Sequence, residues 1–499
     1  MRATTSKNLF SLKQLLVEGG DSRIAPGPDA VNKYGCAVNP HTAQENLFAF
    51  GSATASTISI KALAAAQSIY KKIEAVHCDN TQYQLYENEL EVVRQELKQL
   101  CDLNHQAGVD IIFAASGTDL HLIASQLFAS LSLAPTVVVM VEAVETGSSV
   151  PSALSGRHFD EHTALGSAVI RGEKIAHSKQ IELAQVALRR ADGDSRHSQE
   201  IDDEVDILVQ EAIQQNKHVL LVLTDVTKTG LISPSIATAI RLSRQYPDQL
   251  DVMVDACQFR ISNASLHAYL DQQFLVAVTG SKFLTGPSFS GALFVPATQS
   301  SRLQKLAIPN ALLDYSSRAD WPRAWANADE LRKTVNFGLL LRWVAALAEL
   351  RDFRALSDTD ISNFIQSFQS ALLQYFQCHP QLSLLPTPRL ERDALLCPPG
   401  WDSLPTIFPF VLNSTDGKHV LNREQTLAVY RKLQTEKSMH VGQPVLCGAR
   451  NEVLISALRL CLSARLIVAA ISENGSTAEK IIQNAMQVLD TACELASVA

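Results

Sequence analysis

The sequence lacks the features that mark membrane, secreted and metal-binding proteins. Its N-terminus holds no apolar core long enough for a signal peptide, and no later segment offers the run of about 18 apolar residues that a spanning helix needs. The nine cysteines form no C-x-x-C pair, so neither zinc nor a disulfide framework is indicated. These absences predict a cytoplasmic protein without a bound metal.

The sequence also lacks a large excess of positive charge. The formal net charge is -8, and no dense run of Lys and Arg gives an electrostatic footprint for nucleic acid or a membrane surface. Hydrophobic residues make up 46% and charged residues 19%, which is typical of a folded protein. We therefore expect a small-molecule partner, and neither nucleic acid nor a membrane.

The pattern along the chain predicts an N-terminal arm followed by two domains. Residues 1–57 are irregular, with turn signals at Gly19-Gly20, Pro26-Gly27-Pro28 and residues 32–35. Apolar residues then recur at helical spacing over residues 58–76 and 82–103. At 499 residues the chain exceeds the usual size of one core, so a large domain and a smaller one are expected.

Short apolar runs alternate with helical stretches in the first domain, which we place at residues 58–320. The runs lie at residues 109–115, 135–141, 218–223, 250–254, 274–278 and 291–295. Because they show little polar alternation, they predict strands buried on both faces of a mainly parallel sheet in an α/β domain. The pattern of residues 321–499 predicts a smaller α+β domain. Its helical segments lie near 327–352, 358–377 and 475–497, and its apolar stretches lie near 405–412 and 453–462.

Ligands bind at the carboxyl ends of strands in such sheets, so the polar residues that follow each run are the first candidates. Gly117 and Thr118 follow the first run and open a helical stretch, where free N–H groups and the helix dipole favour a phosphate. Ser116 or Thr118 as a simple helix N-cap explains the same residues equally well.

Two further strand ends carry a carboxylate and an amine. Asp255 directly follows the apolar run at residues 250–254. Its carboxylate has either a structural role, as an ion-pair partner or a helix cap, or a functional role, as an anion that keeps a ring nitrogen protonated. Lys282 follows Thr279, Gly280 and Ser281, whose small side chains leave room for a ligand and supply phosphate donors. A lone Lys is normally solvated, but a desolvated Lys becomes a nucleophile suited to Schiff-base chemistry.

These motifs resemble fold-type I pyridoxal 5'-phosphate (PLP) enzymes of the aspartate-aminotransferase-like fold, especially the class V group that contains cysteine desulfurases and kynureninases. The family pattern is a strand, D-x-x-Q, then S-x-x-K followed by G-P and another strand. This sequence shows Asp255 with Gln258, Thr279 with Lys282, Gly286-Pro287 and the run at 291–295. The resemblance, which covers about residues 116–295, implies PLP as cofactor and a sheet of the seven-stranded type.

The resemblance also implies a role for each matching residue. Lys282 is expected to form the internal aldimine and then to move protons at the substrate carbon, and Asp255 is expected to bond the pyridine nitrogen. Thr279 stands where the family has a phosphate-binding Ser, and Gly117 and Thr118 fit the other side of the phosphate. Gln258 occupies the place of the family glutamine near the phenolic oxygen.

Two segments depart from the family pattern. Thr146 and Gly147 stand near the position at which the family places an aromatic residue or His over the ring. Asp225 replaces the Asn of the family's S-N-x-x-G segment, with extra residues before Gly230. Lys228, in the same segment, is the competing aldimine candidate, but the family order places the lysine after the Asp.

The resemblance extends to substrate and partner. Arg459 resembles the strand arginine that holds the substrate α-carboxylate, and the alternative is an exposed arginine on a strand without this role. Residues 441–444, which include Gln443, are expected to form a loop at the mouth of the site. A homodimer is implied, with residues 334–338 as a candidate contribution to the neighbouring site. The substrate is expected to be an amino acid or an amine.

The fold and the lysine do not identify the reaction, because the cofactor supplies the chemistry and the pocket selects the bond that breaks. An aminotransferase of the class V type is our first expectation. A cysteine desulfurase would use a nucleophile such as Cys447, but Ser281 replaces the His that usually precedes the lysine. A β-lyase or kynureninase-like hydrolase also fits, and a degenerate scaffold or regulator is the non-enzymatic alternative.

Overall fold

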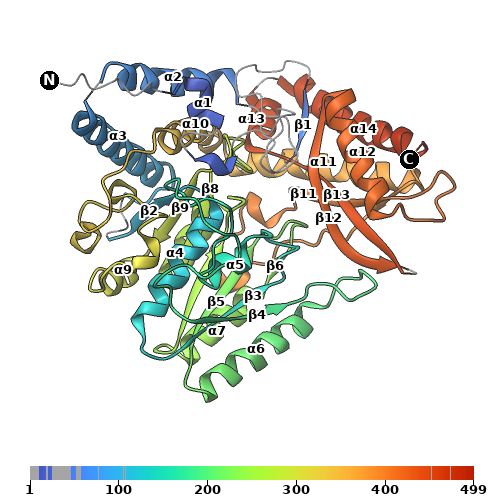
Figure 1. The fold of residues 1–499 in the computed structure, drawn as a ribbon. Coiled ribbons are helices and arrows are strands. Elements are labelled where there is room, and N and C mark those ends of the chain that lie inside the picture. The colour runs from blue at the N-terminus through green and yellow to red at the C-terminus, as the bar shows by residue number, and fades with distance from the viewer. Residues whose placement is uncertain are drawn as a thin grey trace.

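A computed structural model describes residues 10–17, 21–24, 47–51, 58–76, 78–104, 106, 108–450, 452–472 and 474–498. Most of the expected arm, including the turn signals at 19–20, 26–28 and 32–35, lies outside these residues. Figure 1 shows a large sheet flanked by helices and a smaller sheet packed with the C-terminal helices. Within the described residues, no helix combines the length and the apolar character that a membrane crossing requires.

The larger sheet has seven strands on one path, in the order β2-β9-β8-β7-β5-β3-β4, and β6 pairs with β5 beside it. Strand β9 runs antiparallel to β2 and β8, whereas β8, β7, β5, β3 and β4 are parallel to one another. The expected mainly parallel sheet is therefore confirmed. Its strands are β2 Asp110–Ala114, β3 Thr136–Val141, β4 Ile181–Val186, β5 His218–Asp225, β6 Ile232–Ser233, β7 Leu250–Asp255, β8 Leu275–Thr279 and β9 Gly291–Val295.

Helices cover both faces of this sheet, which explains the continuous apolar runs. Alternate residues of one strand enter two different cores: Leu220 and Val222 pack under α4 and α5, whereas Leu221 and Leu223 pack on the opposite face with α3, α6, α7, α8 and α10. The helices are α2 Ile60–Glu74, α3 Asp79–Leu100, α4 Gly117–Leu131, α5 Val150–Leu154, α6 Ser198–Gln214, α7 Ile236–Gln245, α8 Asn263–Asp271, α9 Ala297–Leu303 and α10 Phe337–Arg354.

The smaller sheet has the order β1-β12-β13-β11-β10 and is antiparallel except for β1, which runs parallel to β12. Its strands are β1 Phe48–Phe50, β10 Leu382–Leu384, β11 Ile407–Leu412, β12 Met439–Arg450 and β13 Val453–Cys461. The helices that follow residue 354 are α11 Asp358–Cys378, α12 Arg423–Lys437, α13 Ala464–Ser472 and α14 Asn474–Ala496.

Segments near the N-terminus join both halves of the molecule. Helix α1, Leu12–Val17, packs on α10, where Nη1 of Arg342 donates a hydrogen bond to the Leu15 carbonyl at 3.0 Å. Strand β1 extends the smaller sheet. Helix α10 packs against α2 and α3 as well as α13, so the boundaries at residues 57 and 320 stay predictions.

Two expectations were wrong in detail, and one strand of the larger sheet was not expected. Residues 441–444 are not a loop, because they lie in β12, where a register shift separates Gly442 from Val445. Strand β4 was not expected, because its exposed and buried residues alternate. Helix α10 begins at Phe337 instead of residue 327, since the side chain of Asn336 accepts a hydrogen bond from the Leu339 N–H at 2.9 Å and caps it there.

Candidate active site

A cavity of about 340 Å³ lies at the carboxyl ends of the parallel strands, where α/β sheets bind their ligands. Asp255 ends β7, Thr279 ends β8, and Thr224 lies near the end of β5. The cavity is lined by Ser116, Gly117, Thr118, His121, Glu145, Thr146, Gly147, Ser148, Ser149, Val150, Phe159, Asp160, Arg171, Thr224, Val226, Lys228, Asp255, Cys257, Gln258, Thr279, Ser281, Lys282, Phe289, Ser290 and Gln443.

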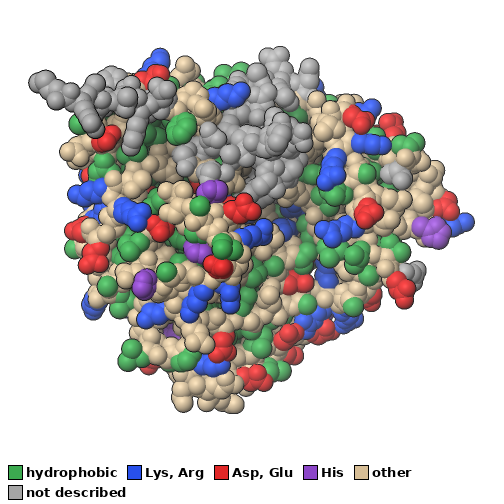
Figure 2. All heavy atoms as spheres, viewed as in Figure 1, with side chains coloured by type: hydrophobic (Ala, Val, Ile, Leu, Met, Phe, Trp, Pro, Cys, Tyr) green, Lys and Arg blue, Asp and Glu red, His purple; other side chains and the backbone are tan. Residues whose placement is uncertain are grey.

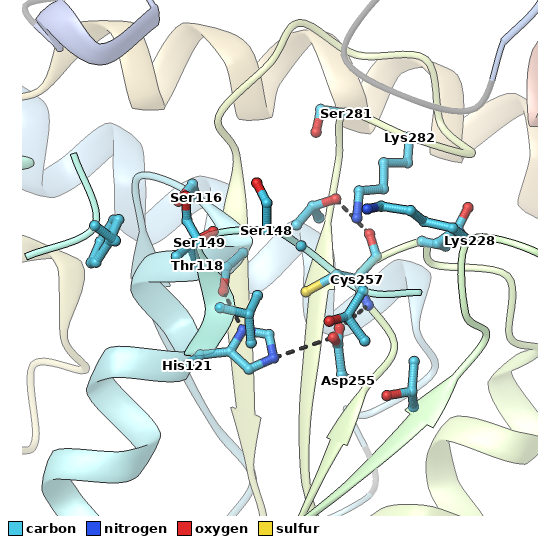
Figure 3. A pocket seen from close by; sticks show the side chains of 18 of the residues that line it. Ser116, Thr118, His121, Ser148, Ser149, Lys228, Asp255, Cys257, Ser281 and Lys282 are labelled. Atoms are coloured by element: carbon cyan, nitrogen blue, oxygen red, sulfur yellow. Dashed lines mark hydrogen bonds and ion pairs between the residues drawn. The ribbon is translucent and has the colours of Figure 1, made fainter. Parts of the chain in front are cut away.

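Asp255 and His121 lie side by side in the wall of this cavity (Figure 3). Asp255 is 7% exposed, and its Oδ2 lies 3.2 Å from Nε2 of His121. Its Oδ1 accepts a hydrogen bond from the Cys257 N–H at 3.1 Å. Burial alone would raise the pKa of Asp255, but the charge and hydrogen bond of His121, together with the charge of Lys282, hold it well below its usual range. The carboxylate is therefore an anion that can receive a positively charged donor.

The tautomer of His121 follows from its other neighbour. Nδ1 lies 2.7 Å from the carbonyl oxygen of Gly117, which can only accept, so Nδ1 carries a proton. His121 lies four residues after Gly117, one turn along α4, and this spacing directs both toward the same end of the sheet. That i, i+4 relation to the glycine is the signal that our sequence interpretation missed.

Lys282 sits in a tightly closed turn between β8 and β9. The Gly280 N–H donates to the Ser290 carbonyl at 2.9 Å, and the Gly286 N–H donates to the Gly280 carbonyl at 2.9 Å. A Cβ on Gly280 would lie 2.5 Å from Cβ of Ala346 in α10, so this position admits only glycine without a shift of the helix. The turn thus holds Lys282 against the cavity, while its side chain remains partly exposed.

The N-terminus of α4 lies on the opposite side of the cavity. Ser116 is the N-cap of this helix, as one of our two interpretations predicted, and its Oγ accepts a hydrogen bond from the Asp119 N–H at 3.3 Å. Gly117 is close to the strand ends: an added Cβ would lie 2.9 Å from Sγ of Cys257 and 3.2 Å from Cγ2 of Thr279. The first-turn amides of the helix therefore reach the cavity, where an anion can bind them.

Several hydroxyl groups of the cavity wall have no protein partner. Among the residues that the structure describes, Oγ1 of Thr146, Oγ1 of Thr224 and Oγ of Ser290 are buried and form no hydrogen bond. Buried polar atoms are rarely left unpaired, so these groups indicate a ligand with several hydrogen-bonding atoms.

The cavity brings together most of the residues predicted from the sequence. Lys282, Asp255, Gln258, Gly117, Thr118, Thr279, Ser281, Thr146 and Gln443 all line it. The side chains of Thr279 and Gln258 are held by backbone carbonyls: Oγ1 of Thr279 donates to the Cys257 carbonyl at 2.6 Å, and Nε2 of Gln258 donates to the Thr227 carbonyl at 2.9 Å.

Asp225 and Arg459 do not line this cavity, contrary to expectation. The Asp225 carboxylate is fully buried, where it pairs with Arg392 and accepts a hydrogen bond from the Tyr269 hydroxyl at 2.7 Å. The Arg459 guanidinium donates to the Gln443 carbonyl through Nε at 3.1 Å and Nη2 at 3.0 Å, and to the Lys228 carbonyl at 3.4 Å. Both groups satisfy their charge or hydrogen bonds inside the protein.

Lys228 supplies a second amine. It follows β5, and its Nζ donates to the Val144 carbonyl at 3.0 Å. Burial lowers its pKa to about 8, and repulsion from Arg459 and Lys282 acts in the same direction, opposed by Glu145. In Figure 3 its side chain points toward that of Lys282.

Two aromatic rings in the wall, Phe159 and Phe289, were not predicted either. The Arg23 guanidinium lies over both rings, 5.6 and 5.2 Å from their centroids. Arg23 itself comes from the N-terminal arm and pairs with Asp119 at 3.0 Å, directly behind the N-terminus of α4. No local sequence pattern indicates this contact, because the residues lie far apart in the chain.

Cys447 lies outside the cavity lining, on β12. It is fully buried among Val411, Val445, Ile455 and other apolar side chains, and this burial raises the pKa of its thiol. Within the described residues no group of three or more His, Cys, Asp or Glu side chains is placed to hold a metal ion.

No family model matches the sequence, and no curated protein matches it. The structure is similar to the cysteine desulfurase CsdA of Escherichia coli, with a TM-score of 0.53 and 17% identity over 97% of this chain and 99% of that chain. It is also similar to a cystine C-S lyase in complex with cysteine persulfide, with a TM-score of 0.54 and 15% identity over 89% of this chain and 98% of that chain. A third similar structure is a NifS-like protein, with a TM-score of 0.52 and 12% identity over 89% of this chain and 99% of that chain. At these identities the likeness establishes the fold, which is the fold-type I architecture that the sequence resemblance implies.

Proposed function

We propose that this chain is a PLP-dependent enzyme that acts on the amino group of an amino acid or amine. The observation that carries the proposal is the placement of Asp255 and Lys282 at the ends of the neighbouring strands β7 and β8, on one cavity. An ionised carboxylate and an amine so arranged match the two protein groups that this cofactor needs.

The wall of the cavity fits the remaining parts of PLP. The α4 amides and the unpartnered hydroxyls of Thr146, Thr224 and Ser290 offer hydrogen bonds to a phosphate and to ring oxygens. Asp255 offers an anion to a protonated ring nitrogen, and Phe159 and Phe289 offer apolar surface. A volume of about 340 Å³ lies within the range of small-molecule sites.

The roles proposed for the chain's own residues follow from their environment. When bound, the cofactor supplies an electron sink. Lys282 would hold the cofactor through Nζ, and its free amine would take and return a proton at the substrate carbon. Asp255 stays ionised beside His121 and so favours a protonated ring nitrogen. Thr279 and Ser281 would line the phosphate side of the pocket, and Gln258 would lie near the phenolic oxygen.

Among the possible reactions we place an aminotransferase of the class V type first, with a β-lyase or kynureninase-like hydrolase second. A desulfurase requires a reactive, mobile thiol. The burial of Cys447 in a strand, and the raised pKa of its thiol, count against this reading. A scaffold without catalytic activity would have no use for the buried, ionised carboxylate of Asp255, because burying unneeded charge is unfavourable.

Reconstitution with PLP tests the proposal. The wild-type protein is expected to develop the visible absorbance of a lysine-bound cofactor, and Lys282→Ala is expected to lose this absorbance while retaining its fold by circular dichroism. Lys228→Ala is the matched control, because it removes the other amine of the same cavity. A wild-type protein that binds no PLP, or an absorbance that depends on Lys228 alone, would refute the proposal.

A further inference from the structure

Lys228 is a cation of the cavity that the proposed chemistry does not use. Its main chain is held from two sides: its N–H donates to the Glu145 carbonyl at 2.7 Å, and its carbonyl accepts from Nη1 of Arg459 at 3.4 Å. The next residue, Thr229, donates through its N–H to Oε2 of Glu145 at 3.1 Å. The loop is therefore fixed, and it directs the Lys228 side chain into the cavity (Figure 3).

The charge of Lys228 is not neutralised within the described part of the chain. Its Nζ donates to one backbone carbonyl, and no described carboxylate forms an ion pair with it. Glu145, the acidic side chain of the wall whose charge acts on Lys228, is already bonded to Arg189 at 3.3 Å and to Thr229. Lys282 and Arg459 add positive charge nearby. A partly buried ammonium group among cations is unfavourable, and an anion bound beside it would offset this cost.

Three anionic groups could meet this amine: the phosphate of the cofactor, its phenolic oxygen, and a carboxylate of the substrate. The phosphate belongs at the N-terminus of α4, and Figure 3 shows Ser116, Thr118 and Ser149 on one side of the cavity, with Lys228 and Lys282 on the other. Lys228 is thus placed beside the reactive amine and away from the phosphate site. The family resemblance assigns the phenolic oxygen to Gln258, so a carboxylate of the substrate is the anion that we assign to Lys228.

The arginine that was expected to bind this carboxylate is not available to it. All three of the Arg459 guanidinium hydrogen bonds go to backbone carbonyls, and the side chain is 3% exposed and outside the cavity lining. Two of those bonds hold Gln443 and one holds Lys228. The amine of Lys228, in contrast, reaches the cavity surface.

We propose that Lys228 binds the carboxylate of the substrate, and hence that the substrate is an amino acid and not an amine without a carboxylate. This inference rests on the proposed function, because it takes the substrate to react beside Lys282. An ammonium with three donors and no acceptor suits a carboxylate, and the cationic neighbours Lys282 and Arg459 add to the attraction.

The first test compares amino acids with the amines formed by their decarboxylation. PLP-loaded protein is titrated with the standard amino acids, and each one that changes the visible spectrum is then compared with its matched amine. The wild type is expected to bind the amino acid at least roughly tenfold more tightly than the amine. Lys228→Met is expected to lose this preference, and Lys228→Arg to retain most of it. No response to any amino acid, equal response to the amines, or an unchanged preference in Lys228→Met would overturn the proposal.

A second test does not depend on turnover. Wild-type protein is labelled with acetic anhydride in the presence of propionate, a carboxylate without an amine, and Lys228 is quantified by mass spectrometry. Propionate is expected to slow labelling of Lys228 but not of Lys98, a partly buried lysine outside the cavity whose pKa burial also lowers. Propanol is the neutral control. Unslowed labelling of Lys228 would overturn the proposal, whereas slowed labelling in a protein whose Lys282 binds no PLP would overturn the proposed function and leave Lys228 only as a carboxylate site.

Discussion

Asp255 carries the largest electrostatic role that we assign to a single residue. Asp255→Asn is expected to retain PLP, since the α4 amides and the cavity hydroxyls remain, but to lower kcat by orders of magnitude. An amide favours a protonated ring nitrogen far less than a carboxylate does, and each pK unit of that preference is worth about 1.4 kcal/mol. Measuring kcat together with PLP content separates the two effects, and a variant with wild-type kcat would contradict the assignment.

The same residue predicts a pH dependence of stability. The pKa of Asp255 is lowered in the folded protein, so its stabilising contribution is present above the pKa of an unfolded Asp, about 4, and is lost as the pH falls through the folded pKa. The stability difference between the wild type and Asp255→Asn in urea unfolding should therefore narrow below about pH 4. A difference that stays constant would indicate that the carboxylate is not held in its charged form.

Cys447 distinguishes the reactions. Cys447→Ser is expected to leave aminotransferase or lyase turnover nearly unchanged, because the thiol lies in an apolar cluster outside the cavity lining. The measurement is product formation by both proteins from the same amino acid. Release of alanine and persulfide sulfur from cysteine by the wild type, abolished in Cys447→Ser, would establish the desulfurase reaction instead.

Individual site residues were predictable where a strand end carries a polar side chain. Asp255 and Lys282 follow apolar runs, and the structure brings both to the cavity. Asp225 also ends a strand, yet it turns to Arg392 and Tyr269, which lie far away in sequence. A strand end places a residue at the right edge of the sheet, but tertiary partners decide the direction of its side chain.

At the level of elements, the N-terminus of α4 depends on a buried ion cluster from the N-terminal segment. Nη2 of Arg23 lies 2.7 Å from Oδ2 of Asp21, and Nη1 lies 3.0 Å from Oδ1 of Asp119, with all three side chains buried. Asp119 in turn accepts a hydrogen bond from Oγ of the N-cap Ser116 at 2.5 Å. The arm thereby supports the helix end to which we assign the phosphate.

Arg23→Ala is therefore expected to destabilise the protein by about 3–5 kcal/mol, because it leaves two carboxylates buried without their partner. PLP should also dissociate faster from the variant. The control is Arg190→Ala, which removes an exposed ion pair with Glu200 and should change the free energy of unfolding by at most about 1 kcal/mol. Urea unfolding of both variants measures the difference, and equal small effects would show that the cluster does not support the helix.

The strands could be predicted from the sequence where all of their residues are buried. The six apolar runs of the large domain correspond to β2, β3, β5, β7, β8 and β9 because both faces of each are covered. Strand β4 alternates between buried and exposed residues, and β12 contains Gly442 and Pro444 beside a register shift, so neither shows a continuous run. Their places in the sheets are set by pairing with neighbours.

At the scale of the whole molecule, the pairing of β1 with β12 joins segments from opposite ends of the chain. Such contacts leave no local pattern, and for this reason the sequence indicated an arm but not the strand that the arm adds. The charged side chains on the face shown in Figure 2 are interspersed in sign, with no single kind gathered over a broad area.

We predict that the molecule is a homodimer related by a twofold axis, with residues 334–338 near the neighbouring site. Within this segment, the side chain of Asn336 is committed to capping α10, so the contribution would come from the residues beside it. Sedimentation velocity of the PLP-loaded protein should show a dimer. A monomer that is active at micromolar concentration would contradict the prediction.

The central claim is that Lys282 bonds the cofactor. The most direct test reduces the PLP-loaded protein with borohydride, digests it, and locates the pyridoxyl group by peptide mass spectrometry. We expect it on Lys282, in the turn between β8 and β9. A pyridoxyl group on Lys228, or on no lysine of the cavity, would contradict the account.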